Sequence, residues 1–237
     1  MRIIIKDNAD EAANFVANQI ALYLIARPTL VMGLATGETM RPVYAQLRQI
    51  FRSGEAPSME FISFNLDEFI SVPKSHPGSF HAYMESELFR HIHEPRVRCF
   101  IPDGMANDLP AEAGAFEAKI KHHGGLDIQL LGIGGNGHIG FNEPGTPFES
   151  RTSVVELSQH TRDAIIGFEA NRPHRAITMG IGTIMEARHC LLLATGEAKA
   201  TAVKTMLSQP ASPTCPASAL QSHADLMIVL DRKATSR

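Results

Sequence analysis

Short apolar runs alternate with amphipathic segments along this 237-residue chain. The runs end at glycine, proline or polar residues, which is typical of strands buried in a parallel sheet. Several segments between them place apolar residues at helical spacing. The predicted strands are residues 30–34, 59–64, 97–100, 128–133, 176–179, 190–194 and 226–230, and the predicted helices are residues 8–26, 41–52, 79–91, 110–123 and 200–207.

This alternation of strands and helices predicts an α/β fold. We expect a single domain over residues 1–237, built as a Rossmann-like three-layer sandwich around a mostly parallel sheet of six or seven strands. Residues 1–5 are suited to a short edge strand. No break in composition suggests a second domain, and we find no internal repeat. We expect the tail from Asp231 onward to be disordered.

The stretch 126–145 concentrates residues that can carry chemistry. A predicted strand runs into a loop with five glycines between Gly132 and Gly140, and Asn136, His138 and Glu143 lie within it or just after it. Ligands of open α/β sheets bind outside the carboxyl ends of the strands. Histidine is the side chain whose charge changes nearest neutral pH. We therefore predict that this loop is the floor of a small-molecule site, with Glu143 facing His138.

The same loop is not predicted to bind a dinucleotide. Gly132, Gly134 and Gly137 match the spacing G-x-G-x-x-G, but that fingerprint needs a helix whose N-terminus meets the pyrophosphate. Here Pro144 and Gly145 follow within a few residues and stop any helix. We expect neither a nicotinamide nor a flavin site, and no other cofactor.

A second strand end, Thr36-Gly37-Glu38-Thr39, leads into the helix predicted from residue 41. Free N–H groups and the helix dipole favour a phosphate at such a turn. An ordinary turn between a strand and a helix has the same pattern, so the segment alone leaves both readings open. It lacks the spacing of a Walker loop.

Adjacent carboxylates, Asp67 and Glu68, follow the strand predicted at 59–64. They could be a helix cap with a solvated neighbour or a catalytic base. Pro73, Pro77 and Gly78 keep the next stretch irregular, which favours the catalytic reading.

Residues 146–175 predict a lid, because the segment is long, polar and without a clear core pattern until about residues 161–170. Its arginines could reach an anionic substrate, although a solvated arginine is the commoner case for any one of them. Lys199, near the start of a later helix, could bind phosphate or lie on the surface. The four arginines of the lid are Arg151, Arg162, Arg172 and Arg175.

Composition narrows the class of protein. The net charge is −3 and no basic patch suggests nucleic acid. No apolar stretch approaches the ~20 residues of a membrane span, and the N-terminus becomes acidic too early for a signal peptide. The three cysteines are far apart, which favours reduced thiols and a cytoplasmic location. His122 and His123 lack a nearby carboxylate or cysteine partner in the sequence, so we predict no metal site.

The strand ends together offer anion-binding turns, a carboxylate and a histidine–glutamate pair. No serine-centred elbow or cofactor lysine is evident. Acid–base chemistry on a phosphorylated small molecule fits these groups best. The reactions left open are enolisation next to a carbonyl, ring opening, and hydrolysis of an ester or lactone.

Several motifs carry a resemblance to a known family. Residues 64–69 (FNLDEF) and 76–80 (HPGSF) resemble the FNMDEY…HPxSY segment of the glucosamine-6-phosphate deaminase (isomerase) family, and residues 132–145 resemble its GxGxDGHIAFNEPG loop. Residues 150–152 (SRT) follow at the family's spacing, and residues 180–188 resemble its VGVGTLLDA segment. The resemblance spans nearly the whole chain. The related 6-phosphogluconolactonases share the fold but lack the FNEPG ending.

The resemblance implies a role for each matching residue. Asp67 would move a proton between C2 and C1 of the open-chain sugar, and His138, oriented by Glu143, would open the pyranose ring. Asn136 stands where the family usually has aspartate, so it can hydrogen-bond the histidine but cannot support an imidazolium by charge. Residues expected to bind substrate are Thr36, Gly37, Thr39, Glu68, Gly137 and Lys199.

This chain departs from the family in its phosphate site and in its regulation. The turn reads TGETMRP rather than TGxTP, so Glu38 brings negative charge that Arg41 could offset. The family's phosphate-binding lid arginine aligns with about Gly167, so that contact is either missing or supplied by Arg162, Arg172 or Arg175. Residues that bind an activator in longer members align with Ser153 and Val155. We predict no activation by N-acetylglucosamine 6-phosphate, which a rate increase on adding that compound would contradict.

Three functions therefore remain to be separated. The leading one is conversion of glucosamine 6-phosphate and water to fructose 6-phosphate and ammonia, with galactosamine 6-phosphate as another substrate to consider. The second is hydrolysis of 6-phosphogluconolactone. The third is a sugar-phosphate sensor without turnover, against which stands the lack of any output module. The chain also ends before the C-terminal extension of hexameric members, so we expect a monomer or a small homo-oligomer.

Overall fold

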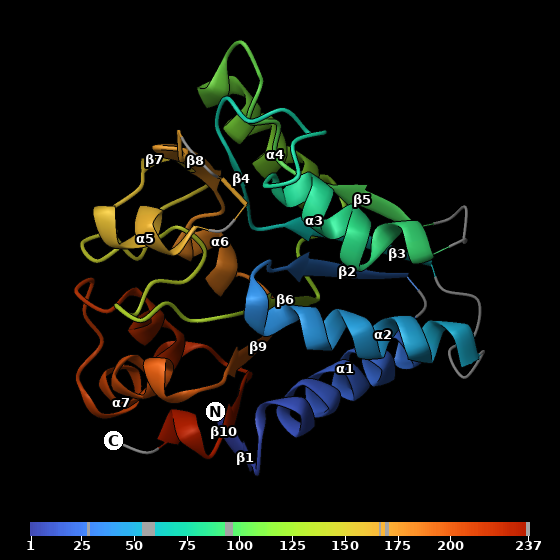
Figure 1. The fold of residues 1–237 in the computed structure, drawn as a ribbon, viewed down its shortest axis with the longest axis vertical. Coiled ribbons are helices and arrows are strands. Elements are labelled where there is room, and N and C mark those ends of the chain that lie inside the picture. The colour runs from blue at the N-terminus through green and yellow to red at the C-terminus, as the bar shows by residue number, and fades with distance from the viewer. Residues whose placement is uncertain (28, 54–59, 93–96, 166, 169–170, 236–237) are drawn as a thin grey trace.

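The computed structural model describes residues 1–27, 29–53, 60–92, 97–165, 167–168 and 171–235 (Figure 1). A sheet of seven parallel strands runs through the molecule in the order β1-β10-β9-β6-β2-β3-β5. This confirms the predicted α/β class and the parallel sheet. The strands are β1 (Arg2–Lys6), β2 (Thr29–Leu34), β3 (Glu60–Asn65), β5 (Arg98–Phe100), β6 (Ile128–Leu131), β9 (His189–Ala194) and β10 (Leu226–Asp231).

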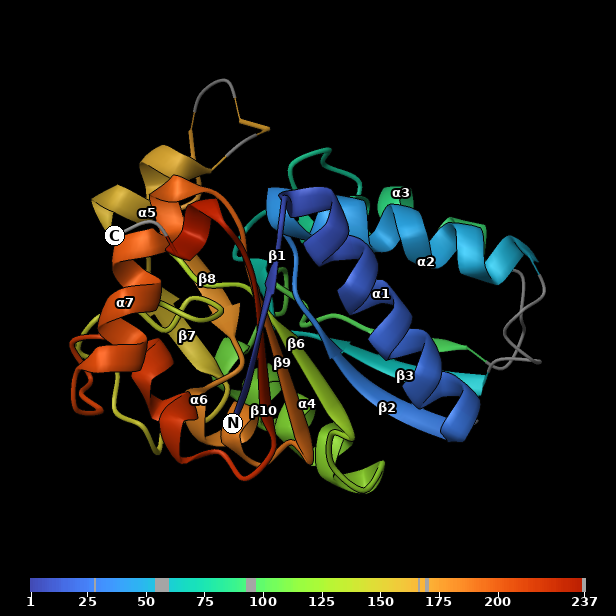
Figure 2. The same ribbon diagram turned by 90° about the horizontal axis from the view of Figure 1, so that it is seen from below.

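Helices cover both faces of this sheet. Figure 2 shows α1 and α2 on one side and α6 and α7 on the other. Shorter 3₁₀ turns connect several strands to their helices, among them Glu38–Met40 and Glu197–Lys199. The helices are α1 (Ala9–Ala26), α2 (Arg41–Ser53), α3 (Phe80–Glu87), α4 (Leu109–His122), α5 (Gln159–Ala164), α6 (Ile181–Met185) and α7 (Ala200–Ser208).

Helix α1 shows how local sequence specifies these elements. Asn8 caps it: its side-chain oxygen accepts from the backbone N–H of Glu11 at 2.9 Å, and its amide donates to the Glu11 carboxylate. The cap satisfies donors that a helix start would otherwise leave unpaired. Residues four apart along the helix, Val16, Ile20 and Leu24, are buried against the sheet. The predicted helix from residue 8 to residue 26 is thereby confirmed.

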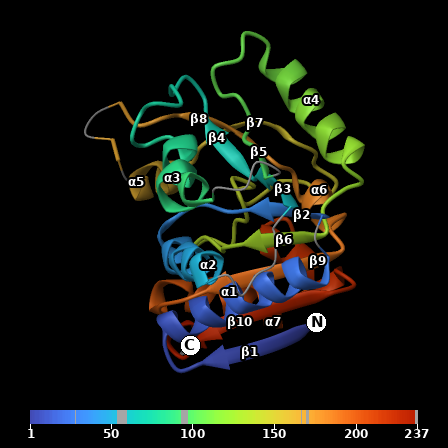
Figure 3. The same ribbon diagram turned by 90° about the vertical axis from the view of Figure 1, so that its right-hand side faces the viewer.

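A second sheet was not predicted. It is antiparallel, with β4 (Asp67–Phe69) and β7 (Ser153–Glu156) on either side of β8 (Arg175–Thr178). The strand expected at 176–179 exists, but it pairs here rather than in the main sheet. Figure 3 shows this small sheet beyond the end of the main sheet that lies opposite β1. Because β4 follows β3 after one residue, the small sheet fixes how the chain leaves the main sheet at Asp67.

The C-terminal tail is ordered as far as it is described, contrary to the expectation of disorder from Asp231. Asp231 ends β10, and its carboxylate accepts hydrogen bonds from the backbone N–H groups of Gly196 and Ala234. Ala234 is fully buried. The tail is thus held by a carboxylate that the sequence pattern alone does not pair with anything.

Candidate active site

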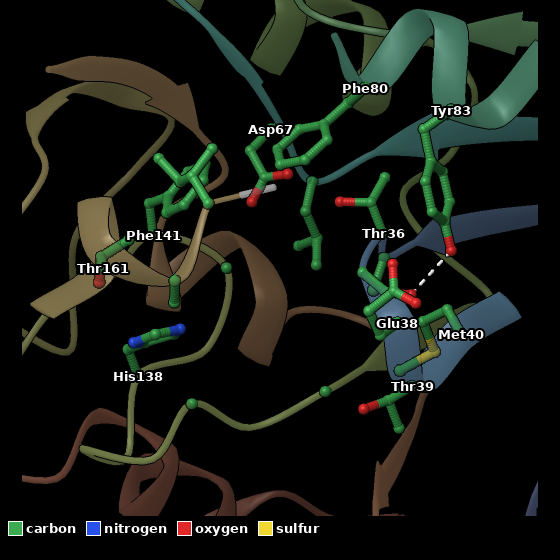
Figure 4. Close-up of a pocket in the computed structure, with 18 of the residues that line it drawn as sticks. Thr36, Glu38, Thr39, Met40, Asp67, Phe80, Tyr83, His138, Phe141 and Thr161 are labelled. Atoms are coloured by element: carbon green, nitrogen blue, oxygen red, sulfur yellow. Dashed lines mark hydrogen bonds between the residues drawn. The ribbon is translucent and has the colours of Figure 1, made fainter. Parts of the chain in front are cut away.

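A cavity of about 620 Å³ opens at the carboxyl ends of β2, β3, β6 and β9. That volume lies in the range of ~300–1,000 Å³ typical of small-molecule sites. Asp67 and His138 both line it, and Figure 4 shows them pointing into the space that has Thr36, Glu38 and Thr39 on its other side. The predicted convergence of separate strand ends is therefore observed.

Asp67 is held rigidly between the two sheets. The residue before it, Leu66, donates its backbone N–H to Leu34 of β2 and accepts from the N–H of Met179 after β8. The Asp67 side chain is 5% exposed. Burial raises the pKa of Asp67 to about 8, and the charge of Glu68 adds to the shift. A carboxyl group with such a pKa can both take and return a proton near neutral pH.

The imidazole of His138 lies directly against the glycine loop. A Cβ on Gly134 would overlap the ring, so only glycine allows this approach. Ring atom Nδ1 lies 3.8 Å from a carboxylate oxygen of Glu143 and has no hydrogen-bond partner in the described part of the chain. Burial lowers the pKa of His138, and the nearby charge of Glu143 opposes that shift. The ring is therefore neutral near pH 7 and can accept a proton.

Glu143 is an ionised carboxylate fixed by three side-chain donors. Asn136 Nδ2 donates to it at 2.8 Å and Ser158 Oγ at 3.0 Å, and the hydroxyl of Thr161 donates as well. Burial alone would raise the pKa of Glu143, but these hydrogen bonds hold it below its ordinary value. Two of the donors belong to the predicted lid: Thr161 lies in α5 and Ser158 caps that helix. Residues of the segment predicted as a lid thus help to position the carboxylate of the histidine–glutamate pair.

Asn136 hydrogen-bonds His138 as expected, but at the backbone N–H of the histidine. Its side-chain oxygen accepts from the backbone N–H of His138 at 3.2 Å, and its amide donates to Glu143. Its effect on the ring therefore passes through the loop and the carboxylate.

The turn after β2 forms another wall of the cavity. Gly37 has φ 105° and ψ 169°, a conformation that L side chains rarely adopt. Its carbonyl accepts from the hydroxyl of Tyr83 at 2.8 Å, and no group in the described part of the chain accepts from its N–H. Thr36, Gly37 and Thr39 line the cavity as predicted.

Two cationic side chains at the cavity, Arg41 and Lys199, differ in whether a carboxylate of the protein pairs with them. Arg41 is paired with Glu38 and Glu87 and lies over the ring of Tyr83, so the expected offset of Glu38 by Arg41 is present. Lys199 also lines the cavity, burial lowers its pKa, and no carboxylate among the described residues pairs with it. Lys199 is therefore the better placed of the two for an anionic ligand.

The arginines of the lid do not reach the cavity. Arg151 pairs with Glu117 and Glu186, outside the cavity. The other three are absent from its lining, so of the two alternatives left open by the sequence the structure favours a missing arginine contact over a substitute from the same segment. Arg162 bonds to Gln159 and His174, Arg172 to the carbonyl groups of Arg162 and Asp163, and Arg175 lies at the surface with Arg172.

Two predicted substrate contacts also lie outside the cavity. Glu68 is 2% exposed, and its carboxylate accepts the backbone N–H groups of Phe69, Phe80 and His81. It therefore caps the start of α3. Gly137 packs against Cys215, which precedes the 3₁₀ turn Pro216–Ser222.

The cavity also has lining residues that sequence reasoning missed: Tyr83 on α3, and His160 and Thr161 on α5. Tyr83 lies in no recognised motif, and the predictions for residues 146–175 rested on their arginines rather than on His160. The described residues contain no group of three or more histidine, cysteine or acidic side chains arranged to hold a metal ion. None of the described helices is both long and apolar enough to cross a membrane.

Comparison with known proteins places this arrangement in a family. A family model described as "Glucosamine-6-phosphate isomerases/6-phosphogluconolactonase" matches residues 5–228. The chain is 44% identical over 237 residues to the glucosamine-6-phosphate deaminase of Bacillus velezensis, an alignment that covers 99% of this chain and 98% of that relative. It is 45% identical over 240 residues to the deaminase of Hahella chejuensis, covering 100% and 92%.

Solved structures agree in fold. A monomeric glucosamine-6-phosphate deaminase superposes with a TM-score of 0.96 at 40% identity, covering 100% of this chain and 99% of that one. A 6-phosphogluconolactonase from Trypanosoma cruzi superposes with a TM-score of 0.79 at 24% identity, covering 100% and 96%, and so shares the fold. This chain therefore belongs to the glucosamine-6-phosphate isomerase/6-phosphogluconolactonase family.

Proposed function

We propose that this protein converts glucosamine 6-phosphate and water to fructose 6-phosphate and ammonia. The observation that carries the proposal is that Asp67 and His138 face one cavity, which Lys199 also lines. The near full-length relatives described above are named glucosamine-6-phosphate deaminases. The proposed reaction combines an aldose–ketose isomerisation with hydrolysis of an imine.

The first chemical step is ring opening. His138 takes the proton of the hydroxyl group on C1 and returns a proton to the ring oxygen as the C1–O5 bond breaks. The neutral imidazole is ready to accept that proton, and ionised Glu143 stabilises the imidazolium that forms for a moment. The product of the step is the open-chain aldehyde.

The second step moves hydrogen from C2 to C1. Asp67 in its ionised form takes the proton from C2 and returns it to C1, while the oxygen on C1 gains the proton that the amino group loses. The intermediate between the two carbon-proton transfers is an enolamine, and the product of the step is an imine at C2. Water adds to the imine carbon and ammonia leaves, so that a ketone remains at C2. A carboxyl group with a pKa of about 8 has a proton affinity suited to both halves of this transfer.

The test is ammonia release from hexosamine 6-phosphates. We expect ammonia and fructose 6-phosphate in equal amounts from glucosamine 6-phosphate, and none with the Asp67→Asn variant. Galactosamine 6-phosphate is assayed in parallel, because Glu38 and the absent lid arginine alter the phosphate site. Acid release from 6-phosphogluconolactone without ammonia release would identify a lactonase instead. Binding of the sugar phosphates without any turnover would identify a sensor.

A further inference from the structure

His160 occupies a corner of the cavity that neither the motifs nor the reaction steps use. It lies on α5, lines the cavity, and has Nε2 3.8 Å from the position that a Cβ on Gly135 would take. The carbonyl oxygen of Ala198, next to Lys199, lies 3.7 Å from that same position. The glycine loop, the lid helix and the turn after β9 therefore meet at this corner.

The position of His160 is fixed by the catalytic loop. Ser158 and Thr161, on either side of it in the same helical turn, both donate to the Glu143 carboxylate. These bonds hold α5 over the loop with His160 beside Gly135. The charges of Lys199 and His160 both lower the pKa of His138, which agrees with all three side chains facing one space.

The charge balance of the cavity calls for a second cation at this corner. A phosphate monoester carries about −1.5 to −2 charges at pH 7. Lys199 supplies one positive charge, while Arg41 is already paired with Glu38 and Glu87. On α5 itself, the Asp163 carboxylate accepts from Gln159 and lies 3.7 Å from Arg172. No carboxylate among the described residues pairs with His160.

We propose that His160 is a phosphate-binding residue, which shares the phosphate group of the substrate with Lys199 and with the turn at Gly37. This inference rests on the proposed function for the identity of the sugar, but not for the binding of phosphate. It is also compatible with the position of the arginines of residues 146–175 outside the cavity: the side chain that this segment brings to the phosphate is His160 on α5.

The experiment measures phosphate affinity and turnover separately. Inorganic phosphate is titrated by calorimetry into the wild type and the His160→Ala, His160→Gln and His160→Lys variants, and kcat and KM are measured with glucosamine 6-phosphate. His122→Ala, an exposed histidine at the end of α4, is the matched control. Because calorimetry needs no turnover, it remains informative if the proposed reaction is wrong.

We expect His160→Ala to weaken phosphate binding and to raise KM by a similar factor of about 10 to 100, the usual effect of losing a hydrogen bond to a charged group. We expect kcat to stay within about threefold, since His160 does not touch the reacting carbons. The lysine variant should recover most of the affinity, the glutamine variant less, and His122→Ala should match the wild type. Unchanged phosphate affinity and KM in both His160→Ala and His160→Gln would overturn the proposal, as would a fall in kcat with KM unchanged.

Discussion

Two turns of this molecule share one sequence and differ in use. The pentapeptide Leu-Ala-Thr-Gly-Glu occurs at residues 34–38 after β2 and at residues 193–197 after β9. Both glycines adopt the same unusual conformation, with φ 105° and ψ 169° at Gly37 and φ 86° and ψ 154° at Gly196. Each turn continues into a 3₁₀ turn and then a helix. Local sequence therefore specifies the backbone of both turns equally.

The neighbours of the two turns decide what each does. The N–H of Gly196 donates to both carboxylate oxygens of Asp231, at 2.9 and 3.1 Å. At Gly37 no described group of the chain takes that place, and the N–H is free for a ligand. The same anion-binding turn is thus closed by the protein's own carboxylate in one copy and open to the cavity in the other. Sequence can predict an anion-binding turn, but the groups packed around the turn decide whether it can bind a ligand.

Replacing Asp67 or Asp231 by asparagine should give the largest difference in kcat between the two turns. Asp67→Asn removes the base beside the open turn, and we expect kcat to fall about 10³-fold or more. Asp231→Asn weakens the closed turn, so we expect kcat within about threefold and a loss of about 1–3 kcal/mol in the free energy of unfolding. Steady-state ammonia release and urea unfolding check the pair. Similar kinetic losses in both variants would remove the distinction between the turns.

Asp67→Asn should increase the stability of the fold, whereas Asp231→Asn should decrease it. Its folded pKa of about 8 lies above the ordinary value of 3.8, so between these values the folded state holds a proton that the unfolded state has lost. The group therefore destabilises the fold increasingly as pH rises from about 4 to 8. We expect Asp67→Asn to unfold at a higher temperature than the wild type at pH 8, with the difference shrinking toward pH 4. A variant less stable than the wild type at pH 8 would contradict the buried, protonated state of Asp67.

Alanine substitution at Gly37 and at Gly196 should destabilise the fold similarly but affect substrate binding only at Gly37. Both positions have positive φ, so both substitutions strain the backbone by about 1–3 kcal/mol. We expect Gly37→Ala also to raise KM about tenfold, because the free N–H would move away from the ligand, while Gly196→Ala leaves KM near the wild-type value. KM and thermal unfolding of the two variants provide the measurement. Equal KM values would show that the open turn does not contact substrate.

The pH dependence of kcat/KM should follow the ionisation of Asp67. Because the base must be ionised, we expect kcat/KM in the wild type to rise with pH through the Asp67 pKa of about 8 and to level off only above that value. Asp231→Asn should keep the same profile, since its carboxylate faces the closed turn. A wild-type profile that is already flat between pH 6 and 8 would assign the proton transfer to another group.

The smallest effect is expected at Asn136. An aspartate there would place a second carboxylate 2.8 Å from Glu143 in the present geometry, and its negative charge would favour the protonated form of His138. We expect Asn136→Asp to shift the acidic limb of the pH–rate profile by a few tenths of a unit. An identical limb in the variant would refute the link between residue 136 and the imidazole.

Much of the fold was predictable because it depends on local pattern. Buried runs and capped helices specified the main sheet, and the loop after β6 put His138 and Glu143 near each other in sequence. The small sheet was missed, because β4 and β7 have three and four residues and too little alternation to be recognised. Their pairing with β8 depends on contacts between distant parts of the chain.

The predicted site was incomplete for a related reason. Adjacent residues of a strand point to opposite faces, so once β4 exists Asp67 and Glu68 cannot both face the cavity. Tyr83 and His160 reach the cavity from helices that pack across it, and no short motif announces them. The five-residue repeat at the two turns is far shorter than the ~20–50 residues of structural repeats, so a search for such units passes over it.

The hydrogen bonds from Ser158 and Thr161 to Glu143 have a consequence for how catalysis is timed. Displacing α5 would take two donors from that carboxylate, raise its proton affinity and weaken its support for a charged imidazole. The acid–base pair is therefore complete only while α5 holds its present position. Two hydroxyl groups of one short helix thus determine whether the catalyst is ready for substrate.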